Sequence, residues 1–243
     1  AKWRAETPNT EPASELLKRI EAEKQQLIAD KKIKKEKPLP LISKDEIPFE
    51  LPEGWAISRL GNLGFTQTGN TPPKKNPDYY GDYIPFLGPA DISISWMKYP
   101  KEGLSKKGID IGRLIPKNSL MMVCIGGSIG KSNLNDRDVS CNQQINTITP
   151  LIALPEYIRT VCQSPFFQNE VLSKSSGSAT PIINKGKWEN IPVPVPSISE
   201  QKALKELLNV LLKSCDKLEK EIVLGKQQIY KLMQSCLKEV FEG

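Results

Sequence analysis

The segment 126–132, GGSIGKS, carries the residue types of a nucleotide-binding loop. It follows the apolar run LMMVCI and ends in Gly-Lys-Ser, as does a P-loop, whose backbone amides and lysine hold phosphates. A P-loop has four residues between its first glycine and the Gly-Lys pair, and the position that glycine should occupy is Ile125. The next residues, SNLNDRD, lack the apolar periodicity of the helix that a P-loop enters. Nucleotide binding is therefore disfavoured.

A second catalytic signature is nearly present at Asn76–Tyr79, NPDY. N6-adenine methyltransferases carry Asn-Pro-Pro-Tyr, but the third position here is Asp78, and no glycine-rich loop follows a strand to bind a cofactor. The segment predicts a surface turn. A nucleotide-binding module or a self-contained adenine methyltransferase remains the enzymatic alternative.

The composition excludes other chemistry. The chain has no histidine, which removes zinc-finger ligand sets, Ser-His-Asp and Cys-His pairs, and the commonest general base. No spacing of carboxylates resembles a metal or glycosidase site. We therefore predict no metal, no cofactor and no enzyme activity of the chain itself. The five cysteines are widely spaced and are expected to be buried or half-buried reduced thiols: Cys124, Cys141, Cys162, Cys215 and Cys236.

Three polar clusters remain, and they point to nucleic acid. Residues 71–76 hold two adjacent lysines with tyrosines close by, residues 142–144 (NQQ) offer amides that can read adenine edges, and residues 176–187 (SGSATPIINKGK) form an exposed polar segment with two lysines. The net charge of +6 is concentrated in the same region. Residues 54–198 carry 15 Lys and Arg against 10 Asp and Glu, a net of +5, which favours an anionic partner.

The elements that position these clusters follow from periodicity and turn signals. Apolar residues repeat with a helical period over 11–28, where Pro12 suits the first turn and Thr10 or Glu11 the cap. Short strands are predicted at WAISRL, YIPFLG, SLMMVCI and QINTITP, a helical turn at 103–111, and a helix over 155–173 that Pro165 kinks or divides. The proline-rich segment 191–197 is expected to be an extended connector. The pattern is that of an α+β fold.

The lysine run 31–37, KKIKKEK, lies in a linker after the first helix. It has two interpretations. It is either a solvated linker or a strap that contacts DNA phosphates.

A coiled-coil seam is the most regular feature of the chain. Ser197–Glu200 has the form of a capping box, and apolar residues then step by fours and threes through five heptads. Such a stripe needs a partner helix, from this chain or another. The seam residues with large apolar side chains are Leu204, Leu208, Leu211, Leu218, Ile222, Ile229 and Leu232.

Nothing in the chain predicts a membrane segment or a signal peptide. The longest apolar run is far too short to cross a bilayer, and the N-terminal residues lack an apolar core. A cytoplasmic location is expected, with no membrane partner.

A series of motifs occurs in order along the chain: EPASELLKRIEAEKQQLI (11–28), KIKKEKPLP (32–40), EIPFELPEGWAISRLGNLG (46–64), TGNTP (68–72), IPFLGPADI (84–92), GSIGK (127–131), CNQQINTITP (141–150), SGSATPIIN (176–184) and IPVPVPSISEQKAL (191–204). In these motifs the sequence resembles the specificity subunit of type I restriction–modification systems. Each motif alone is weak. Their order makes the set specific.

The resemblance implies a DNA-recognition subunit without catalysis of its own. Such subunits carry two target recognition domains, joined by long helices that form an antiparallel coiled coil, and each domain reads one half of a split DNA target. Methyltransferase subunits that use S-adenosylmethionine and an ATP-driven restriction subunit supply the chemistry. The alternative is an assembly protein that has lost recognition.

This chain departs from that pattern because LPEGW and GSIGK each occur once. It therefore has a single recognition domain, either as a half-length subunit that pairs with a second copy or another half-subunit, or as a segment of a longer chain. The expected divisions are a conserved helix and linker at 1–50, the recognition domain at 51–198 and the coiled-coil helix at 199–243.

In such domains, variable loops read the DNA, and GSIGK is a tight turn between strands. Amides and hydroxyls are expected to read bases, and lysines to hold phosphates. The candidate DNA-binding residues are Lys74, Lys75, Asn76, Tyr80, Lys131, Gln143, Ser178, Thr180 and Lys187.

Overall fold

The computed structural model describes residues 2–7 and 10–242. It divides into two compact units, Ala1–Gln201 and Lys202–Gly243, called here the α+β unit and the helical unit. The helices are α1 (Lys2–Glu6), α2 (Ala13–Ala29), α3 (Lys106–Gly112), α4 (Pro155–Cys162), α5 (Pro165–Lys174), α6 (Lys185–Glu189) and α7 (Ile198–Glu242), and short 3-10 turns are η1 (Lys44–Glu46), η2 (Leu60–Leu63), η3 (Pro77–Tyr79) and η4 (Pro89–Asp91).

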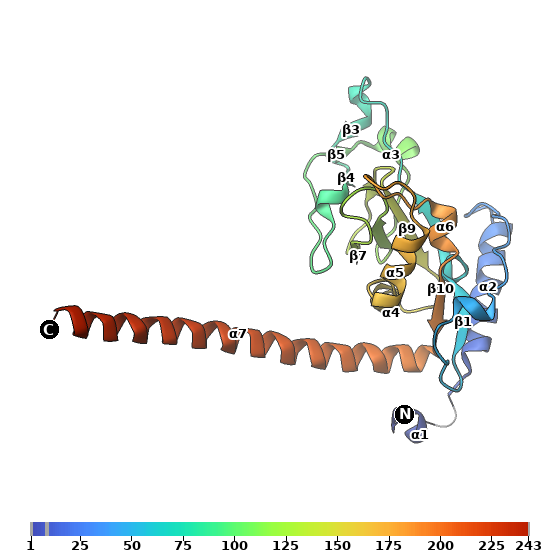
Figure 1. Ribbon diagram of the computed structural model, residues 1–243. Coiled ribbons are helices and arrows are strands. Elements are labelled where there is room, and N and C mark those ends of the chain that lie inside the picture. The colour runs from blue at the N-terminus through green and yellow to red at the C-terminus, as the bar shows by residue number, and fades with distance from the viewer. Residues whose placement is uncertain (1, 8–9, 243) are drawn as a thin grey trace. The chain divides into compact units, whose positions relative to one another are not determined.

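Short strands build three sheets in the described part of the α+β unit (Figure 1). They are β1 (Ala56–Arg59), β2 (Gly64–Thr68), β3 (Tyr80–Gly81), β4 (Ile84–Leu87), β5 (Gly103–Leu104), β6 (Leu120–Val123), β7 (Ser132–Leu134), β8 (Ser140–Cys141), β9 (Ile145–Pro150) and β10 (Pro192–Val195). One sheet has the order β2-β9-β6-β7 and is antiparallel throughout. A second has the order β3-β5-β4-β8, in which β4 and β8 run parallel, and β1 pairs with β10.

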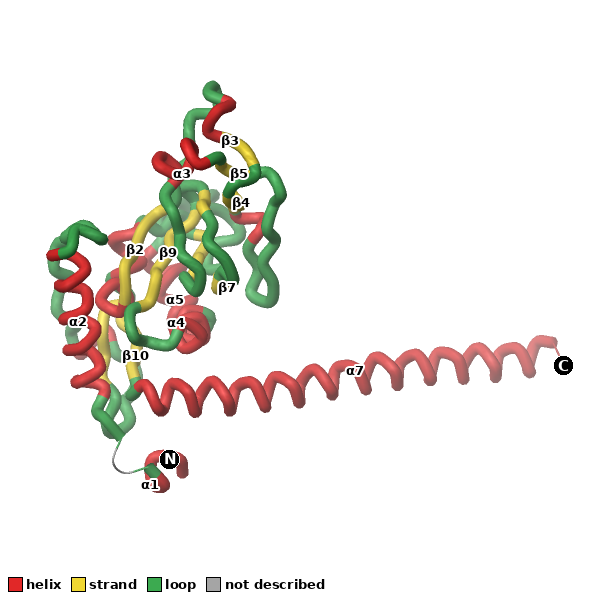
Figure 2. Tube along the Cα trace, turned by 180° about the vertical axis from the view of Figure 1, so that it is seen from behind, coloured by secondary structure: helices red, strands yellow, loops and turns green. Residues whose placement is uncertain are grey.

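The core fills the space between the two larger sheets. All four residues of β6 are buried, because α4 packs against β6, β7 and β9, and Met121 and Val123 share a buried cluster with Leu87 and Cys141 of the second sheet. Figure 2 shows α2 beside β2, at the free edge of the first sheet. The buried cluster between the sheets consists of Leu87, Ile92, Ile115, Met121, Val123, Val139, Cys141 and Ile145.

The α+β prediction is confirmed, and most predicted elements form. Strands lie within WAISRL, YIPFLG, SLMMVCI and QINTITP. The helix predicted over 155–173 is divided as expected. Ser164 caps α5 through the backbone N–H of Phe167, and Pro165 occupies the first turn, where a missing N–H costs nothing.

The extended connector predicted at 191–197 is wrong in one respect, because its residues form strand β10. Prolines occupy alternate positions, and the register places Val193 and Val195 opposite Ser58 and Ala56 of β1. Successive backbone N–H groups of a strand point to opposite edges, so the prolines fall where β1 needs no donor. The outward carbonyl of Pro194 instead accepts a hydrogen bond from the Tyr157 hydroxyl at 2.8 Å.

Three smaller expectations are also corrected. The helical turn predicted at 103–111 begins later, because β5 occupies its start and Ser105 caps α3. The N-cap of α2 is Pro12 itself, without a side-chain hydrogen bond, rather than Thr10 or Glu11. Cysteines 124, 141 and 162 are buried as expected, but Cys215 and Cys236 are exposed on α7.

One of the two hydrogen bonds of the predicted capping box forms at the start of α7. The backbone N–H of Glu200 donates to Ser197 Oγ at 3.2 Å. The carboxylate of Glu200 does not return to the cap. It accepts from Trp55 Nε1 and Arg4 Nε, both at 2.8 Å, and so ties this end of α7 to the rest of the α+β unit.

Candidate nucleic-acid interface

The loop that leaves β2 carries the first predicted cluster, and its start is held tightly. The backbone N–H of Gly69 donates to Ile145 O, and that of Asn70 to Cys141 O. A Cβ on Gly69 would lie 2.1 Å from Asn142 O, so only glycine allows this close approach. From this anchor the chain continues to Lys74 and Lys75, which are both exposed.

A second loop, residues 142–144, lies against the first. The Thr71 hydroxyl donates to Gln143 Oε1 at 2.7 Å, across 72 positions of sequence. Asn142 Oδ1 accepts from the backbone N–H of Gln144 and fixes the turn, which leaves Gln143 exposed. On its other side the turn reaches the residue that follows β6, because Cys124 N donates to Gln144 O at 2.8 Å.

The third loop is the GGSIGK segment, which is a tight turn between β6 and β7. Gly126 and Gly130 have φ angles of 88° and 87°, in the region that favours glycine. A Cβ on Gly130 would lie 2.1 Å from Gln168 Oε1. Strand β7 begins at Ser132, immediately after Lys131, so the segment opens no helix whose N-terminus could hold a phosphate in the manner of a P-loop.

A fourth loop, residues 176–182, joins the third. Gly126 N donates to Pro181 O at 2.9 Å, and Ile125 and Ile182 form an isolated antiparallel bridge. Ser178 and Thr180 are exposed in this loop. The structure therefore connects the predicted clusters in a chain of contacts, from the loop of Lys74 through Gln143 and the turn of Lys131 to Ser178 and Thr180.

Three of the predicted DNA-binding side chains also make hydrogen bonds to the backbone of the protein. Asn76 Oδ1 accepts from the backbone N–H of Asp78 and caps η3, which is the surface turn predicted for NPDY. The Tyr80 hydroxyl donates to Pro72 O at 2.7 Å. Lys187 Nζ donates to Lys174 O at 3.0 Å, and its residue lies on α6 rather than in one of the four loops.

Sequence reasoning missed several basic residues near these loops. Lys107 Nζ pairs with Asp78 Oδ2 at 3.1 Å beside the Tyr79 ring, and Lys106 lies over the Tyr83 ring. Arg113 Nη1 donates to Thr68 O at 2.6 Å, where β2 ends. The sequence shows Tyr79 and Tyr83 close to Lys74 and Lys75, as part of the first polar cluster. It carries no signal that links Arg113 to β2.

The described residues form no cluster suited to a metal ion, and the cysteines of the α+β unit are buried. No group of three or more Cys, Asp or Glu side chains within 2–7 and 10–242 could hold a metal ion. Burial raises the pKa of Cys124 and of Cys141 to about 12, which keeps both thiols protonated. Among those same residues, no helix has the length and apolarity needed to span a bilayer.

Residues 52–224 match the family model of the type I restriction modification DNA specificity domain. The chain belongs to this family. Similar relatives include the specificity subunits of the type I restriction enzymes EcoAI and EcoEI of Escherichia coli, at 31% and 32% identity. Each alignment covers 95% of this chain and 40% of the relative, so the chain spans less than half the length of these specificity subunits.

Solved structures related to the specificity family share the fold. A chain from a structure of the type I R-M system superposes with a TM-score of 0.65 at 18% identity, over 94% of this chain and 53% of that one. The HsdS subunit from Thermoanaerobacter tengcongensis superposes with a TM-score of 0.59 at 17% identity, over 86% and 47%.

Proposed function

We propose that the chain is a non-catalytic, sequence-specific DNA recognition subunit of a type I restriction–modification complex. It reads one half of a bipartite target in double-stranded DNA and docks methyltransferase subunits, and the restriction subunit joins through that assembly. S-adenosylmethionine and ATP act on those partners. The proposed location is the cytoplasm.

One observation carries the proposal. Four loops with exposed lysine, amide and hydroxyl groups are joined by hydrogen bonds, from Thr71–Gln143 to Gly126–Pro181. Strands anchor these loops, which is how folded domains hold binding residues in a fixed geometry. Lysines suit phosphates and amides suit base edges, so the joined surface has the chemistry of both contacts that specific DNA binding needs.

We further propose that the seam of α7 pairs with the same seam of a second copy or of another half-subunit, in an antiparallel coiled coil. The helical unit is a single helix in the described residues, so its stripe finds no partner within that unit. The chain belongs to the specificity family, and its alignment with the EcoAI subunit covers 40% of that relative's length. Both observations support a second recognition domain in the complete assembly.

The experiment is a salt series of duplex binding. The chain, assembled with methyltransferase subunits, is titrated against a fluorescent duplex at increasing salt, and the logarithm of the binding constant is plotted against that of the salt concentration. We expect a steep negative slope, because each neutralised phosphate releases counterions. The variant Lys74→Gln/Lys75→Gln should make the slope shallower by about 1 per lysine.

The matched control is Lys18→Gln. Lys18 is an exposed lysine of α2, with 73% of its side chain accessible, and it pairs with Glu15 rather than with a loop. Its slope should equal that of the unmodified chain. Binding that does not respond to salt would contradict the proposed function, and an equal loss of slope in both variants would remove the loops from the interface.

A further inference from the structure

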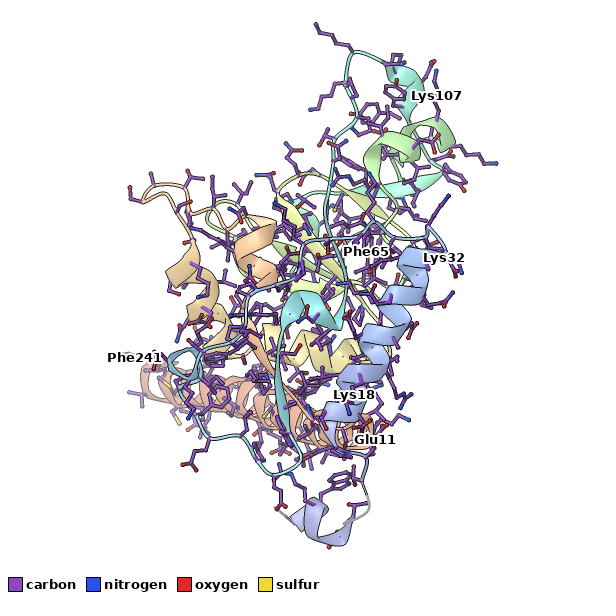
Figure 3. The ribbon with its side chains drawn as sticks, turned by 90° about the vertical axis from the view of Figure 1, so that its right-hand side faces the viewer. Glu11, Lys18, Lys32, Phe65, Lys107 and Phe241 are labelled. Atoms are coloured by element: carbon purple, nitrogen blue, oxygen red, sulfur yellow. The ribbon has the colours of Figure 1, made fainter. Side chains whose placement is uncertain are left out.

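A cleft of about 410 Å³ lies between the lysine-rich linker and the edge of the first sheet. We call it the strap cleft, and the strap is residues 32–36. One wall is the strap itself, and the other is β2 from Phe65 to Thr68 with Arg113 beside it. Figure 3 shows Lys32 just beyond the end of α2, on the same side of the molecule as Phe65.

The strap is fixed to the sheet by an ion-pair network. Lys185 Nζ lies 2.5 Å from Glu36 Oε1, 2.7 Å from Glu189 Oε2 and 3.0 Å from Thr66 Oγ1. Burial opposes the charge on Lys185, but the hydrogen bonds to Glu189 and Glu36 outweigh it and raise the pKa of the ammonium group. The network therefore persists at neutral pH and fixes Glu36, so this part of the linker is not a free tether.

The remaining charges in the cleft are mostly positive. Lys32, Lys34 and Arg113 line it together with Lys185, whereas Glu36 is the single carboxylate among the lining residues and is occupied by Lys185. Lys32 also approaches Asp30 at 3.3 Å, in a pair whose lysine is 66% exposed, which contributes little in water. A cleft with three further cations has the chemistry of an anion site.

The cleft continues into the proposed DNA interface. Arg113 Nη1 holds the carbonyl of Thr68, the last residue of β2, and the loop that carries Lys74 and Lys75 begins at the next residue. A duplex bound by that loop would extend its sugar–phosphate backbone past Thr68. The cations of the cleft are placed to neutralise it.

Building on the proposed function, we propose that the strap cleft is a second, sequence-independent contact that receives backbone phosphates of DNA flanking the recognised bases. Lys32 and Lys34 supply charge from the linker, and Arg113 supplies it from the sheet edge. These two lysines of the run thus form a built phosphate contact rather than a solvated spacer.

The same run contains its own control. Lys35 and Lys37 line a different hollow of about 230 Å³, formed with Glu21, Lys24 and Gln25 of α2. Lys34 and Lys35 are neighbours in the linker but line different hollows, so the lysines of this one segment are divided between two surfaces. The test compares Lys32→Gln/Lys34→Gln with Lys35→Gln/Lys37→Gln, which remove equal charge from the same six-residue stretch, 32–37.

Both variants and the unmodified chain are assembled with methyltransferase subunits and titrated with a random-sequence duplex across a salt series. We expect the 32/34 variant to lose about tenfold in affinity near 0.1 M salt and to have a slope shallower by about 2, since each phosphate contact contributes about 0.9. The 35/37 variant should match the unmodified chain. The four lysines are exposed, so folding is not at risk, and circular dichroism checks it.

The outcomes separate the two proposals. If the unmodified chain binds with a steep salt slope and the 32/34 variant does not differ from the 35/37 variant, the cleft proposal is overturned while the proposed function stands. If the 32/34 variant instead weakens only its association with the methyltransferase subunits, the cleft receives protein and the phosphate assignment is wrong. If the unmodified chain shows no salt-dependent binding, both proposals fail together.

Discussion

Arg59 joins three distant parts of the chain through its guanidinium group. It is 5% exposed, and its nitrogens donate to Pro40 O, Leu41 O and Asn190 O and, in bidentate fashion, to the carboxylate of Glu46. These contacts hold the linker against the β1–β10 pair. Lysine has neither the planar fork nor the number of donors to replace it.

The Glu46 carboxyl makes this clasp sensitive to acid. The hydrogen bond from Arg59 lowers its pKa from the ordinary value of 4.5 to about 2. A carboxyl with a lowered pKa in the folded state stabilises the fold above its unfolded pKa, and this stability is lost as the pH falls through the folded value. The contribution is therefore complete above pH 4.5 and disappears toward pH 2.

We predict that Glu46→Gln destabilises the α+β unit by roughly 1.5–3 kcal/mol at neutral pH, the range for hydrogen bonds to charged groups. The difference from the unmodified chain should shrink as the pH is lowered below 4.5. Urea unfolding followed at several pH values measures it. The control is Glu50→Gln, at an exposed position of the same linker, and a variant at position 46 whose loss of stability does not depend on pH would contradict the account.

Among the elements, α7 carries an apolar stripe that no other described element of its own unit covers. The predicted helix forms over Ile198–Glu242, and its seam residues Leu211, Leu218 and Ile222 are each more than half exposed. A continuous apolar stripe of this length is uncommon on a helix that stays single in water. The pairing proposed above would cover it.

We predict that Leu211→Glu/Leu218→Glu converts a paired chain into monomers. Each leucine buried in a coiled coil contributes about 1.5–3 kcal/mol, and a carboxylate introduced at the seam is costly to bury without a partner. Light scattering at matched concentrations measures the mass. Lys213→Glu/Lys220→Glu introduces the same two carboxylates in place of lysines away from the seam and should leave the mass unchanged, whereas a chain with the same mass in all three forms would rule out pairing through this stripe.

The elements that sequence predicted well are those whose signal is local. LMMV in β6 and the Ser164–Pro165 boundary between α4 and α5 follow from apolar runs and capping preferences. Strand β10 was missed because its prolines are compatible with a strand only when β1 lies on one side, and that pairing joins residues more than 130 positions apart.

For the molecule as a whole, the candidate interface was predictable in residue type but not in arrangement. Gln143 and Lys131 were identified from composition, yet the hydrogen bonds that join their loops span up to 72 positions. Arg113 had no sequence signal, because its role depends on where β2 ends. The identities of the side chains that contact bases stay predictions.

The most direct measurement of the central claim is selection of duplexes from a random pool by the chain assembled with methyltransferase subunits, followed by sequencing. Two paired copies should enrich one short motif in inverted repeat at fixed spacing, as twofold symmetry requires. Gln143→Ala should change the preferred bases while Lys18→Gln keeps them, because Gln143 is exposed in the joined loops and Lys18 lies on α2. A pool without any enriched motif, or the same motif from the Gln143 variant, would contradict recognition of DNA by these loops.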